Sequence, residues 1–342
     1  MFSLPFEQGP IRPVDEADSL LIRTTRGCPW NRCSFCALYD TMTFSIRPVE
    51  EIKQDIWAAR DYFGGHPFTA CFLQDGDSFV MRTKDLIEIL DTLKQAFPSL
   101  RQISSYGRAQ TMVKKSARAI QEICDAGLNK LYCGMESGSR EVLEKIRKGI
   151  TPESIIQSAR MARQAGMHTT QFIILGLGGT ELSETHALET ARVFNEINPD
   201  HIRVLTIGVK PGTDLDRQMR QGEWTRPSEA AMIAEQRQMF EHLEGIDSHY
   251  ANHHSVDLLL EIRGQLPGDR QRLMGIMDRF LSLPEPLQTN FIMGRRLGYY
   301  RTLDDQAREP DFRFVETKVQ KALASGHESL EDLFHHLRTQ VI

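Results

Sequence analysis

The sequence predicts an α/β fold, a partial (β/α)6 TIM-like barrel followed by a helical C-terminal region. Short apolar runs alternate with amphipathic helical patterns from about residue 19 to residue 210. The alternation then ends, and residues 226–342 carry mostly helical patterns without strand alternation. Strands that alternate with helices form a parallel sheet with right-handed crossovers. An open doubly wound sheet is the alternative arrangement of the same units.

The expected elements follow one another in a regular order. The strands cover residues 19–25, 69–74, 101–107, 129–136, 168–176 and 201–209. The helices between them cover residues 48–63, 83–97, 113–127, 152–166 and 183–197. Both arrangements bind ligands beyond the carboxyl ends of the strands, so the residues that follow each strand are the site candidates. We divide the chain into an N-terminal extension (1–18), a barrel (19–215) and a helical region (216–342).

Composition limits the classes of function. The chain has 342 residues, a net charge of -5 and 40% hydrophobic residues, which is typical of a globular protein with a sizeable core. Its mild acidity argues against nucleic acid as a partner, because unspecific binding needs a broad positive surface. The longest apolar stretch, around residues 172–179, is shorter than the ~18 residues that span a bilayer. The N-terminus lacks the pattern of a signal peptide, so we expect a cytoplasmic protein.

Three of the six cysteines crowd into one short loop after the first expected strand, as Cys28-x4-Cys33-x2-Cys36. Three thiolates at such a spacing can hold an iron–sulfur cluster, and the lack of a fourth nearby cysteine leaves one iron open to another ligand. A zinc site completed by a distant histidine is one alternative, and unconnected thiols are another. The remaining cysteines lie within expected strands and a helix, where we expect buried thiols.

Polar and glycine-rich motifs follow the later strands. Asp75-Gly76-Asp77 follows the second strand, and Ser105-Tyr106-Gly107-Arg108 closes the third. Glu136-Ser137 closes the fourth, and Gly176-Leu177 closes the fifth. Each motif also has a plain structural interpretation, since Asp-Gly and Gly-rich segments form ordinary turns. Together with the cysteine loop, however, they indicate a ligand site at one end of the sheet.

With these motifs, residues 19–215 resemble the radical SAM superfamily. The similarity is to the branch with oxygen-independent coproporphyrinogen oxidase, the tRNA methylthiotransferases and the Elongator catalytic subunit. The resemblance implies that the three cysteines bind a [4Fe–4S] cluster. It also implies that the amino and carboxylate groups of S-adenosylmethionine chelate the fourth iron. The usual spacing is C-x3-C-x2-C, so the four-residue first gap is a departure that leaves the subgroup open.

The resemblance also implies roles for residues outside the cysteine loop. Phe35 lies where the family places an aromatic residue whose backbone is near the adenine. Asp75-Gly76-Asp77 stands where the family binds the ammonium group of the cofactor. Glu136 is expected at the ribose, and Lys148, twelve residues later, at the methionine carboxylate. The expected cofactor contacts are Phe35, Asp75, Gly76, Asp77, Ser105, Glu136, Ser137, Lys148, Gly176 and Leu177.

The candidates for the substrate side come from two places. Tyr106 and Arg108 follow the third strand. His249, Asn252 and His253 lie in a histidine-rich segment. His249 and His253 are four residues apart, which predicts that they share a helix face. Such histidines are more often surface or capping residues. The arginine- and tyrosine-rich residues 294–301 have two interpretations, a grip on an anionic substrate or a solvated helix with a packed tyrosine.

The implied activity is that of a radical SAM enzyme, an oxidoreductase or a transferase. It would cleave S-adenosylmethionine reductively to a 5′-deoxyadenosyl radical, which abstracts hydrogen from a small or medium organic substrate. The electron would come from a flavodoxin- or ferredoxin-like donor. A haem-binding or trafficking protein related to coproporphyrinogen oxidase is one alternative. A tRNA-modifying enzyme is another, weakened by the acidic charge and by the lack of a recognisable RNA-binding β-barrel.

Overall fold

The computed structural model describes residues 4–252, 254–324 and 329–340. Its main sheet has eight strands in the order β1-β4-β5-β6-β7-β8-β9-β10, and β2 and β3 form a separate antiparallel pair. The pairs β1–β4, β4–β5, β5–β6 and β8–β9 are parallel, whereas β9–β10 is antiparallel. The strands are β1 (Leu20–Arg23), β2 (Thr25–Arg26), β3 (Ser45–Ile46), β4 (Ala70–Gln74), β5 (Gln102–Tyr106), β6 (Leu128–Glu136), β7 (His168–Leu175), β8 (His201–Thr206), β9 (His249–Asn252) and β10 (Arg263–Gln265).

Helices connect the strands in the alternating order that the sequence predicts, and the α/β fold class is confirmed. The helices are α1 (Val49–Tyr62), α2 (Thr83–Ala96), α3 (Ala109–Met112), α4 (Ala117–Asp125), α5 (Arg140–Lys145), α6 (Pro152–Gln164), α7 (Ser183–Ile197), α8 (Asp214–Arg220), α9 (Glu229–Glu241), α10 (Arg270–Leu281), α11 (Glu285–Arg296), α12 (Glu309–Ala324) and α13 (Leu330–Thr339). Short 3-10 turns are η1 (Val14–Glu16), η2 (Ser78–Val80) and η3 (Leu303–Ala307).

Two expected elements differ from the structure. The helix expected over residues 113–127 is α4, Ala117–Asp125, and it begins only at Ala117, because the Ser116 side chain accepts the Ala119 N–H and caps it. The separate short helix α3, Ala109–Met112, precedes it. The expectation that no strand recurs after residue 226 is wrong, since β9 and β10 lie there. Strand β9 has four residues, too few to show a period of two, and it pairs with β8. His249 therefore begins a strand rather than a helix, and His253 lies outside the described residues.

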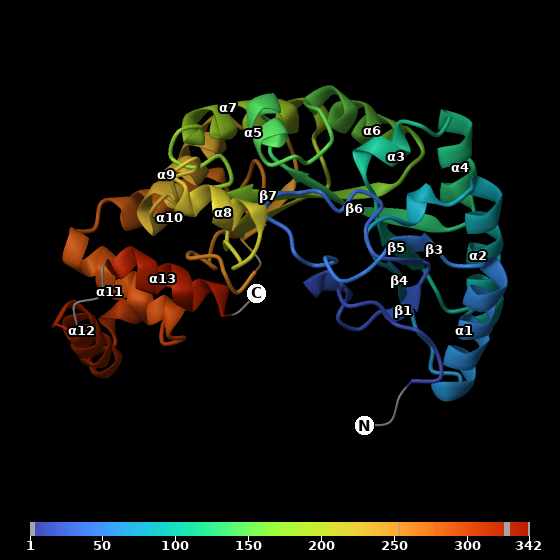
Figure 1. Cartoon of the computed structure of the whole chain (residues 1–342), viewed down its shortest axis with the longest axis horizontal. Helices are drawn as coiled ribbons and strands as arrows, with labels where there is room; N and C mark the ends of the chain where they lie inside the picture. The colour runs from blue at the N-terminus through green and yellow to red at the C-terminus, as the bar shows by residue number, and fades with distance from the viewer. Residues whose placement is uncertain (1–3, 253, 325–328, 341–342) are drawn as a thin grey trace. The chain divides into compact units, whose positions relative to one another are not determined.

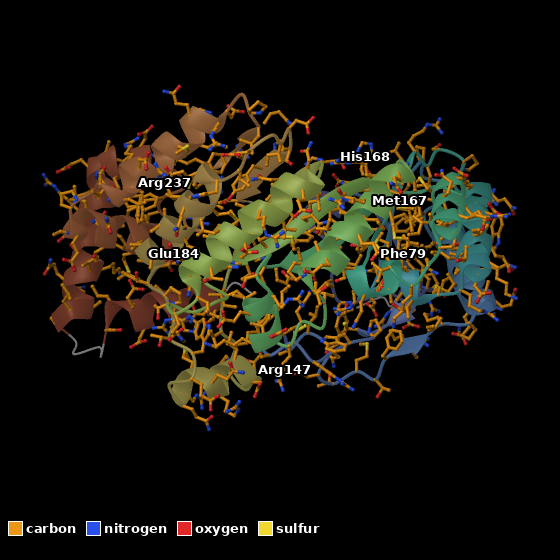
Figure 2. All side chains as sticks on the ribbon, turned by 90° about the horizontal axis from the view of Figure 1, so that it is seen from above. Phe79, Arg147, Met167, His168, Glu184 and Arg237 are labelled. Carbon is orange, nitrogen blue, oxygen red and sulfur yellow. The ribbon has the colours of Figure 1, made fainter. Side chains whose placement is uncertain are left out.

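The chain divides into two compact units, cut within the expected barrel. Unit 1 comprises residues up to 135 and 149–171, and unit 2 comprises residues 136–148 and those from 172 onwards. In unit 1, helices α1, α2 and α4 cover one side of β1, β4 and β5 (Figure 1). Apolar side chains from these elements form one core, which includes Phe79 and Met167, both labelled in Figure 2. This core holds the strand ends that carry the cysteine loop and its neighbours.

The described part of the N-terminal extension belongs to unit 1 and packs against its helix α1 and strand β4. Phe6 is buried, and its ring lies 6.1 Å from that of Tyr62 and 6.0 Å from that of Phe63 on α1's end. The Gln74 side chain accepts the Gly9 N–H at 2.9 Å and donates back to the Gly9 carbonyl at 3.2 Å. The extension therefore reaches the carboxyl end of β4, immediately before Asp75.

Unit 2 contains a buried ionic cluster on its C-terminal helices. The Glu229 carboxylate accepts from Arg296 at 2.9 and 2.6 Å and from Arg338 at 2.9 Å. Burial of a charge is tolerated only when it is paired in this way. In the arginine- and tyrosine-rich segment, Tyr300 is fully buried and is a packing residue of unit 2, whereas Tyr299 is 38% exposed. Among the described helices, none is long and apolar enough to cross a membrane.

Candidate cluster and cofactor site

The start of the cysteine loop is fastened to the end of β4 by Asp75 and Gly76. The Asp75 Oδ2 atom accepts the Gly27 N–H at 2.8 Å and the Arg23 Nε and Nη2 donors at 2.9 and 2.7 Å. The Gly76 N–H donates to the Gly27 carbonyl at 3.2 Å. Asp75 is fully buried, and burial raises its pKa although Arg23 and the Gly27 N–H act to lower it. The carboxylate thus anchors Gly27, the residue before Cys28.

The backbone at this junction is tight. A Cβ atom on Gly76 would lie 3.0 Å from the Cα atom and 3.1 Å from the Cβ atom of Cys28, so a larger residue would displace the loop. Asp75 itself has a φ of 73°, which is uncommon for a residue other than glycine. Strained residues of this kind persist where surrounding contacts over-determine them, and such positions cluster at functional sites. The hydrogen bonds of Asp75 supply that constraint.

Asp77 is likewise engaged inside unit 1. Its carboxylate accepts the N–H groups of Phe79, at 3.1 Å, and of Arg108, and it also accepts the Thr111 hydroxyl. Burial raises the pKa of Asp77 to about 6. Asp77 therefore ties the end of β4 to the beginning of α3. The expectation that Asp75-Gly76-Asp77 binds the ammonium group of the cofactor stays a prediction. In this structure, Asp75 holds the cysteine loop and Asp77 holds the segment before α3.

The four-residue first gap of the cysteine loop is accommodated by a left-handed turn and a packed indole. Asn31 has a φ of 43°, and its side-chain amide donates to the Tyr39 carbonyl at 3.1 Å. The Trp30 ring covers Gly149 so closely that a Cβ atom there would collide with it. The guanidinium groups of Arg32 and Arg108 lie 5.4 and 5.8 Å from the centre of the Trp30 ring. The extra residue is thus part of an ordered structure.

The three thiols of this loop are partly accessible to solvent. Cys28, Cys33 and Cys36 are each partly exposed, and none forms a disulfide. In the described part of the chain, no three His, Cys, Asp or Glu side chains converge on a position where they could hold one metal ion. That finding concerns mononuclear sites, whose ligands share one centre, whereas each thiolate of a four-iron cluster binds its own iron.

Unsatisfied hydroxyl groups in and beside the loop fit an iron–sulfur cluster. Buried polar atoms normally have hydrogen-bond partners. Yet the hydroxyls of Thr25, Ser34 and Tyr39 are buried without one among the described residues. Ser34 stands between Cys33 and Cys36, and Thr25 precedes the loop. Cluster and thiolate sulfurs accept hydrogen bonds, so a bound cluster would give such donors a partner. The residues present therefore fit the group.

In unit 2, the end of β6 carries a buried ion pair. Glu136 has a φ of 63°, and the Lys148 Nζ atom donates to its Oε1 atom at 2.7 Å. Both residues are nearly buried, with 8% and 7% of their surface exposed. Glu136 is thus a second residue with a strained backbone among the cofactor contacts expected from the sequence. The twelve-residue separation of the pair is bridged by α5, whose residues place Lys148 back beside the strand end.

A buried polar network joins the ends of β6 and β7. The Ser137 hydroxyl lies 2.7 Å from His186 Nδ1 on α7, and His186 Nε2 lies 3.7 Å from Glu235 Oε1 on α9. The Glu235 carboxylate accepts the Gly176 N–H at 2.7 Å and the Ser183 hydroxyl at 2.6 Å. Burial raises the pKa of Glu235, although His186 and the Gly176 N–H act to lower it. This network fixes the two strand ends against each other.

Sequence reasoning did not find His186 and Glu235. Both lie within regular helices, at positions 49 residues after Ser137 and 59 residues after Gly176. The available signal was a polar residue on an otherwise apolar helix face, which indicates a buried polar partner but does not name it.

At the end of β7, protein side chains already fill the space beside Gly176. A Cβ atom on Gly176 would lie 2.8 Å from the Met232 sulfur and 3.0 Å from the Ile207 side chain. Leu177 is fully buried, and its carbonyl accepts the Trp224 indole N–H at 3.2 Å. Glycine at position 176 is thus required for packing against Met232 and Ile207, and the expected contact of Gly176 and Leu177 with the adenine stays a prediction.

The remaining sequence candidates are placed as follows. Ser105 is buried and donates to the Tyr106 carbonyl, and the Tyr106 ring packs 5.1 Å from that of Phe72. Phe35 is partly exposed within the cysteine loop. Asn252 is buried and bonded to Gln236 at 2.6 Å, so it is a packing residue of unit 2. The His249 ring lies 5.5 Å from that of His201.

The strand-end candidates are thus grouped within each unit. Cys28, Cys33, Cys36, Asp75, Gly76, Asp77 and Arg108 are brought together in unit 1. Glu136, Ser137, Lys148, Gly176 and Leu177 are brought together in unit 2.

Known proteins support the same assignment. Residues 22–191 match the Radical SAM superfamily. An uncharacterized methyltransferase from Pyrococcus horikoshii is 28% identical over 221 residues, which are 62% of this chain and 45% of that protein. The heme chaperone HemW from Bacillus subtilis is 21% identical over 201 residues, 57% of this chain and 52% of the chaperone. The chain thus spans about half the length of these curated relatives.

Among solved structures, similar folds include the cobalamin-dependent S-adenosylmethionine radical enzyme OxsB with aqua-cobalamin and S-adenosylmethionine bound. The TM-score is 0.51 at 14% identity, and the match covers 94% of this chain and 57% of that one. At this identity the likeness shows the fold. The likeness confirms the expected fold, and the superfamily match confirms the expected family with its cofactors. The chain therefore belongs to the radical SAM superfamily, whose enzymes use a [4Fe–4S] cluster and S-adenosylmethionine.

Proposed function

We propose that Cys28, Cys33 and Cys36 hold the [4Fe–4S] cluster and leave its fourth iron open for S-adenosylmethionine. The observation that carries this proposal is the set of buried hydroxyls without partners in and beside the cysteine loop. When bound, the cluster supplies the electron that cleaves S-adenosylmethionine to methionine and a 5′-deoxyadenosyl radical, which takes hydrogen from the substrate. The chain's own residues hold and orient both groups.

In this proposal, Arg23 and Asp75 hold the cysteine loop in place. Their hydrogen bonds to each other and to the Gly27 N–H fix where the loop leaves β1. Preorganisation of this kind keeps the ligands in position before the cofactor binds. Gly76 contributes by letting the end of β4 pass beside Cys28.

Glu136 and Lys148 are the proposed polar contacts of the cofactor. Glu136 can accept hydrogen bonds from the ribose hydroxyls, and Lys148 offers a positive charge to the methionine carboxylate. Their 2.7 Å pair does not prevent both roles, because an ammonium group has three donors and a carboxylate has two oxygens. Gly176 and Leu177 would present backbone groups to the adenine.

The proposed substrate is a small or medium organic molecule, and the proposed electron donor is a flavodoxin- or ferredoxin-like protein. Tyr106 and Arg108, which follow β5, are the proposed substrate-side residues in unit 1. His249 stays a candidate in unit 2.

Anaerobic reconstitution tests the cluster assignment. The wild-type chain and the Cys28→Ala/Cys33→Ala/Cys36→Ala triple variant would be compared for iron and sulfide content and for 5′-deoxyadenosine released under dithionite. Cys124→Ala is the matched control, because Cys124 is a partly exposed thiol on α4. We expect the control to behave as wild type and the triple variant to lose both cluster and product. Release of 5′-deoxyadenosine by the triple variant would sink the proposal.

Methyl transfer is a second candidate for the overall reaction, favoured by the similarity to the Pyrococcus horikoshii methyltransferase. S-adenosylmethionine labelled on its methyl group separates the two reactions in a cell extract. Label that remains in methionine, with stoichiometric 5′-deoxyadenosine, supports hydrogen abstraction alone. Label transferred to an extract metabolite supports methyl transfer. Haem titration of the same preparation tests haem binding, which the similarity to the heme chaperone raises.

A further inference from the structure

Tyr39, three residues after Cys36, differs from the other deeply buried tyrosines of the chain. The residue is 3% exposed, and its hydroxyl has no hydrogen-bond partner among the described residues. The fully buried Tyr132, Tyr250 and Tyr300 each have one, supplied by Glu16, Gln236 and Asn290. A buried hydroxyl without a partner is unfavourable, so an orphan of this kind calls for a ligand that satisfies it.

The Tyr39 backbone is hydrogen-bonded to the cysteine loop. The Tyr39 carbonyl accepts the Asn31 side-chain amide at 3.1 Å and the Met42 N–H at 3.0 Å. Asn31 lies between Cys28 and Cys33, so these bonds tie Tyr39 to the first gap of the loop. The phenol itself is buried near Cys28 and Asp75, whose charges act on it.

The groups around the phenol keep it protonated. Burial raises the pKa of Tyr39, and the nearby Asp75 carboxylate, Tyr106 and Cys28 raise it further, against the opposing effect of Arg23. The hydroxyl is thus a hydrogen-bond donor at neutral pH. Of these neighbours, Asp75 already uses Oδ2 for Arg23 and Gly27, and its Oδ1 atom faces Gly9 in the N-terminal segment.

We propose that the Tyr39 hydroxyl donates a hydrogen bond to a sulfur of the cluster or to the Cys28 thiolate and thereby raises the cluster's reduction potential. The inference rests on the proposed function, because it assumes that the three cysteines hold the cluster. Hydrogen bonds to the sulfurs set cluster potentials, since a donor stabilises the more negative, reduced state. Tyr39 is a positioning and tuning residue and takes no part in bond cleavage.

The test is a redox titration of the full chain without S-adenosylmethionine. Wild-type and Tyr39→Phe proteins are reconstituted anaerobically, their iron and sulfide are counted, and the midpoint potential is followed by the electron paramagnetic resonance signal of the reduced cluster. We expect full cluster content in both and a more negative potential in Tyr39→Phe. A tenfold change in the reduction equilibrium corresponds to about 59 mV for one electron.

Tyr250→Phe is the matched control, because it removes a buried tyrosine hydroxyl that is already bonded to Gln236 in unit 2. Its potential should equal that of the wild type. An unchanged potential in a fully loaded Tyr39→Phe protein would overturn the inference, and it would leave the cysteine assignment intact. It would also point to Asp75 Oδ1 as the acceptor of the Tyr39 hydroxyl.

A second measurement covers the case in which Tyr39→Phe fails to fold or to bind iron. The reduced wild-type cluster is prepared in H2O and in D2O, and exchangeable hydrogens near it are measured by pulsed electron paramagnetic resonance. We expect a strongly coupled exchangeable hydrogen in the wild type. The coupling should be absent when 4-fluorophenylalanine is incorporated biosynthetically at position 39, because fluorine then replaces the ring hydroxyl. A wild-type spectrum without such a coupling would refute the hydrogen bond.

Discussion

Replacement of Asp75 by glycine should loosen the attachment of the cysteine loop to the end of β4, leaving the backbone bond from Gly76 to Gly27 in place. The substitution removes three hydrogen bonds, from the Gly27 N–H and from two Arg23 donors, all to one buried oxygen. Glycine accepts the φ of 73° at this position, so the loss of the side chain is measured without backbone strain. Arg23 keeps one carboxylate partner, Glu7, at 2.8 Å.

The expected magnitude follows from these contacts. Breaking a buried ion pair by removing one partner costs about 3–5 kcal/mol, because the other charge stays buried. Part of the attraction between Asp75 and Arg23 only offsets the cost of burying the Asp75 charge, because burial raises the pKa of Asp75. In the variant, Glu7 still pairs with the Arg23 charge. We therefore expect a loss near the lower end, about 3 kcal/mol of unfolding free energy. Asp75→Asn tolerates the same backbone and keeps an acceptor for the Gly27 N–H, so it should lose about half as much.

Urea unfolding monitored by circular dichroism measures both losses in the cluster-free chain. A double-mutant cycle with Arg23→Gln isolates the coupling between the two side chains, which we expect to exceed about 1 kcal/mol. A loss below about 1 kcal/mol in Asp75→Gly, together with additive effects in the cycle, would refute the view that Asp75 anchors the loop.

Three further perturbations test other parts of the structure. Glu235→Ala leaves two buried donors without an acceptor, so it should cost about 1–3 kcal/mol of unfolding free energy. It should also speed amide hydrogen exchange at the end of β7, measured by mass spectrometry, and unchanged exchange would contradict the network. Burial raises the pKa of Asp77 from 3.8 to about 6, so the folded state binds this proton more tightly and the stability that it contributes is lost as pH rises between those values. In urea titrations from pH 4 to 6, the slope of unfolding free energy against pH should therefore be about 1.4 kcal/mol per pH unit more negative in the wild type than in Asp77→Asn, and equal slopes would disprove the assignment. Gly149→Ala should lower the melting temperature more than Gly212→Ala. Both positions have a positive φ, but only at Gly149 would the added Cβ atom collide with the Trp30 ring. Equal decreases in melting temperature would count against that contact.

The fold was predictable because each strand–helix unit carries its own local pattern. The helix expected over residues 83–97 is α2, Thr83–Ala96, whose buried leucines and isoleucines recur at helical spacing. The strand expected over residues 69–74 is β4, Ala70–Gln74, with four buried residues in succession, as in a strand covered on both faces. Strand β9 was missed because its four residues show no period, and its pairing with β8 is a tertiary contact.

The cysteine loop could be found from the sequence because three ligands fall within nine residues. The support around it could not, since its contacts join distant positions. Asp75 meets Gly27 across 48 residues, and nothing near Asp75 in the sequence signals that partner. The orphan hydroxyl of Tyr39 is also invisible in a sequence, because it is defined by what the fold fails to place beside it.

Isotopic labelling with 57Fe offers the most direct test of the central claim that three cysteines hold a four-iron cluster with one open site. The wild-type chain is reconstituted with 57Fe under anaerobic conditions, and Mössbauer spectra are recorded before and after addition of S-adenosylmethionine. We predict four irons per chain, with one of the four changing its spectrum when S-adenosylmethionine is added, and no cluster in the triple cysteine variant. A single bound metal ion, or a four-iron cluster that survives replacement of Cys28, Cys33 and Cys36, would contradict the claim.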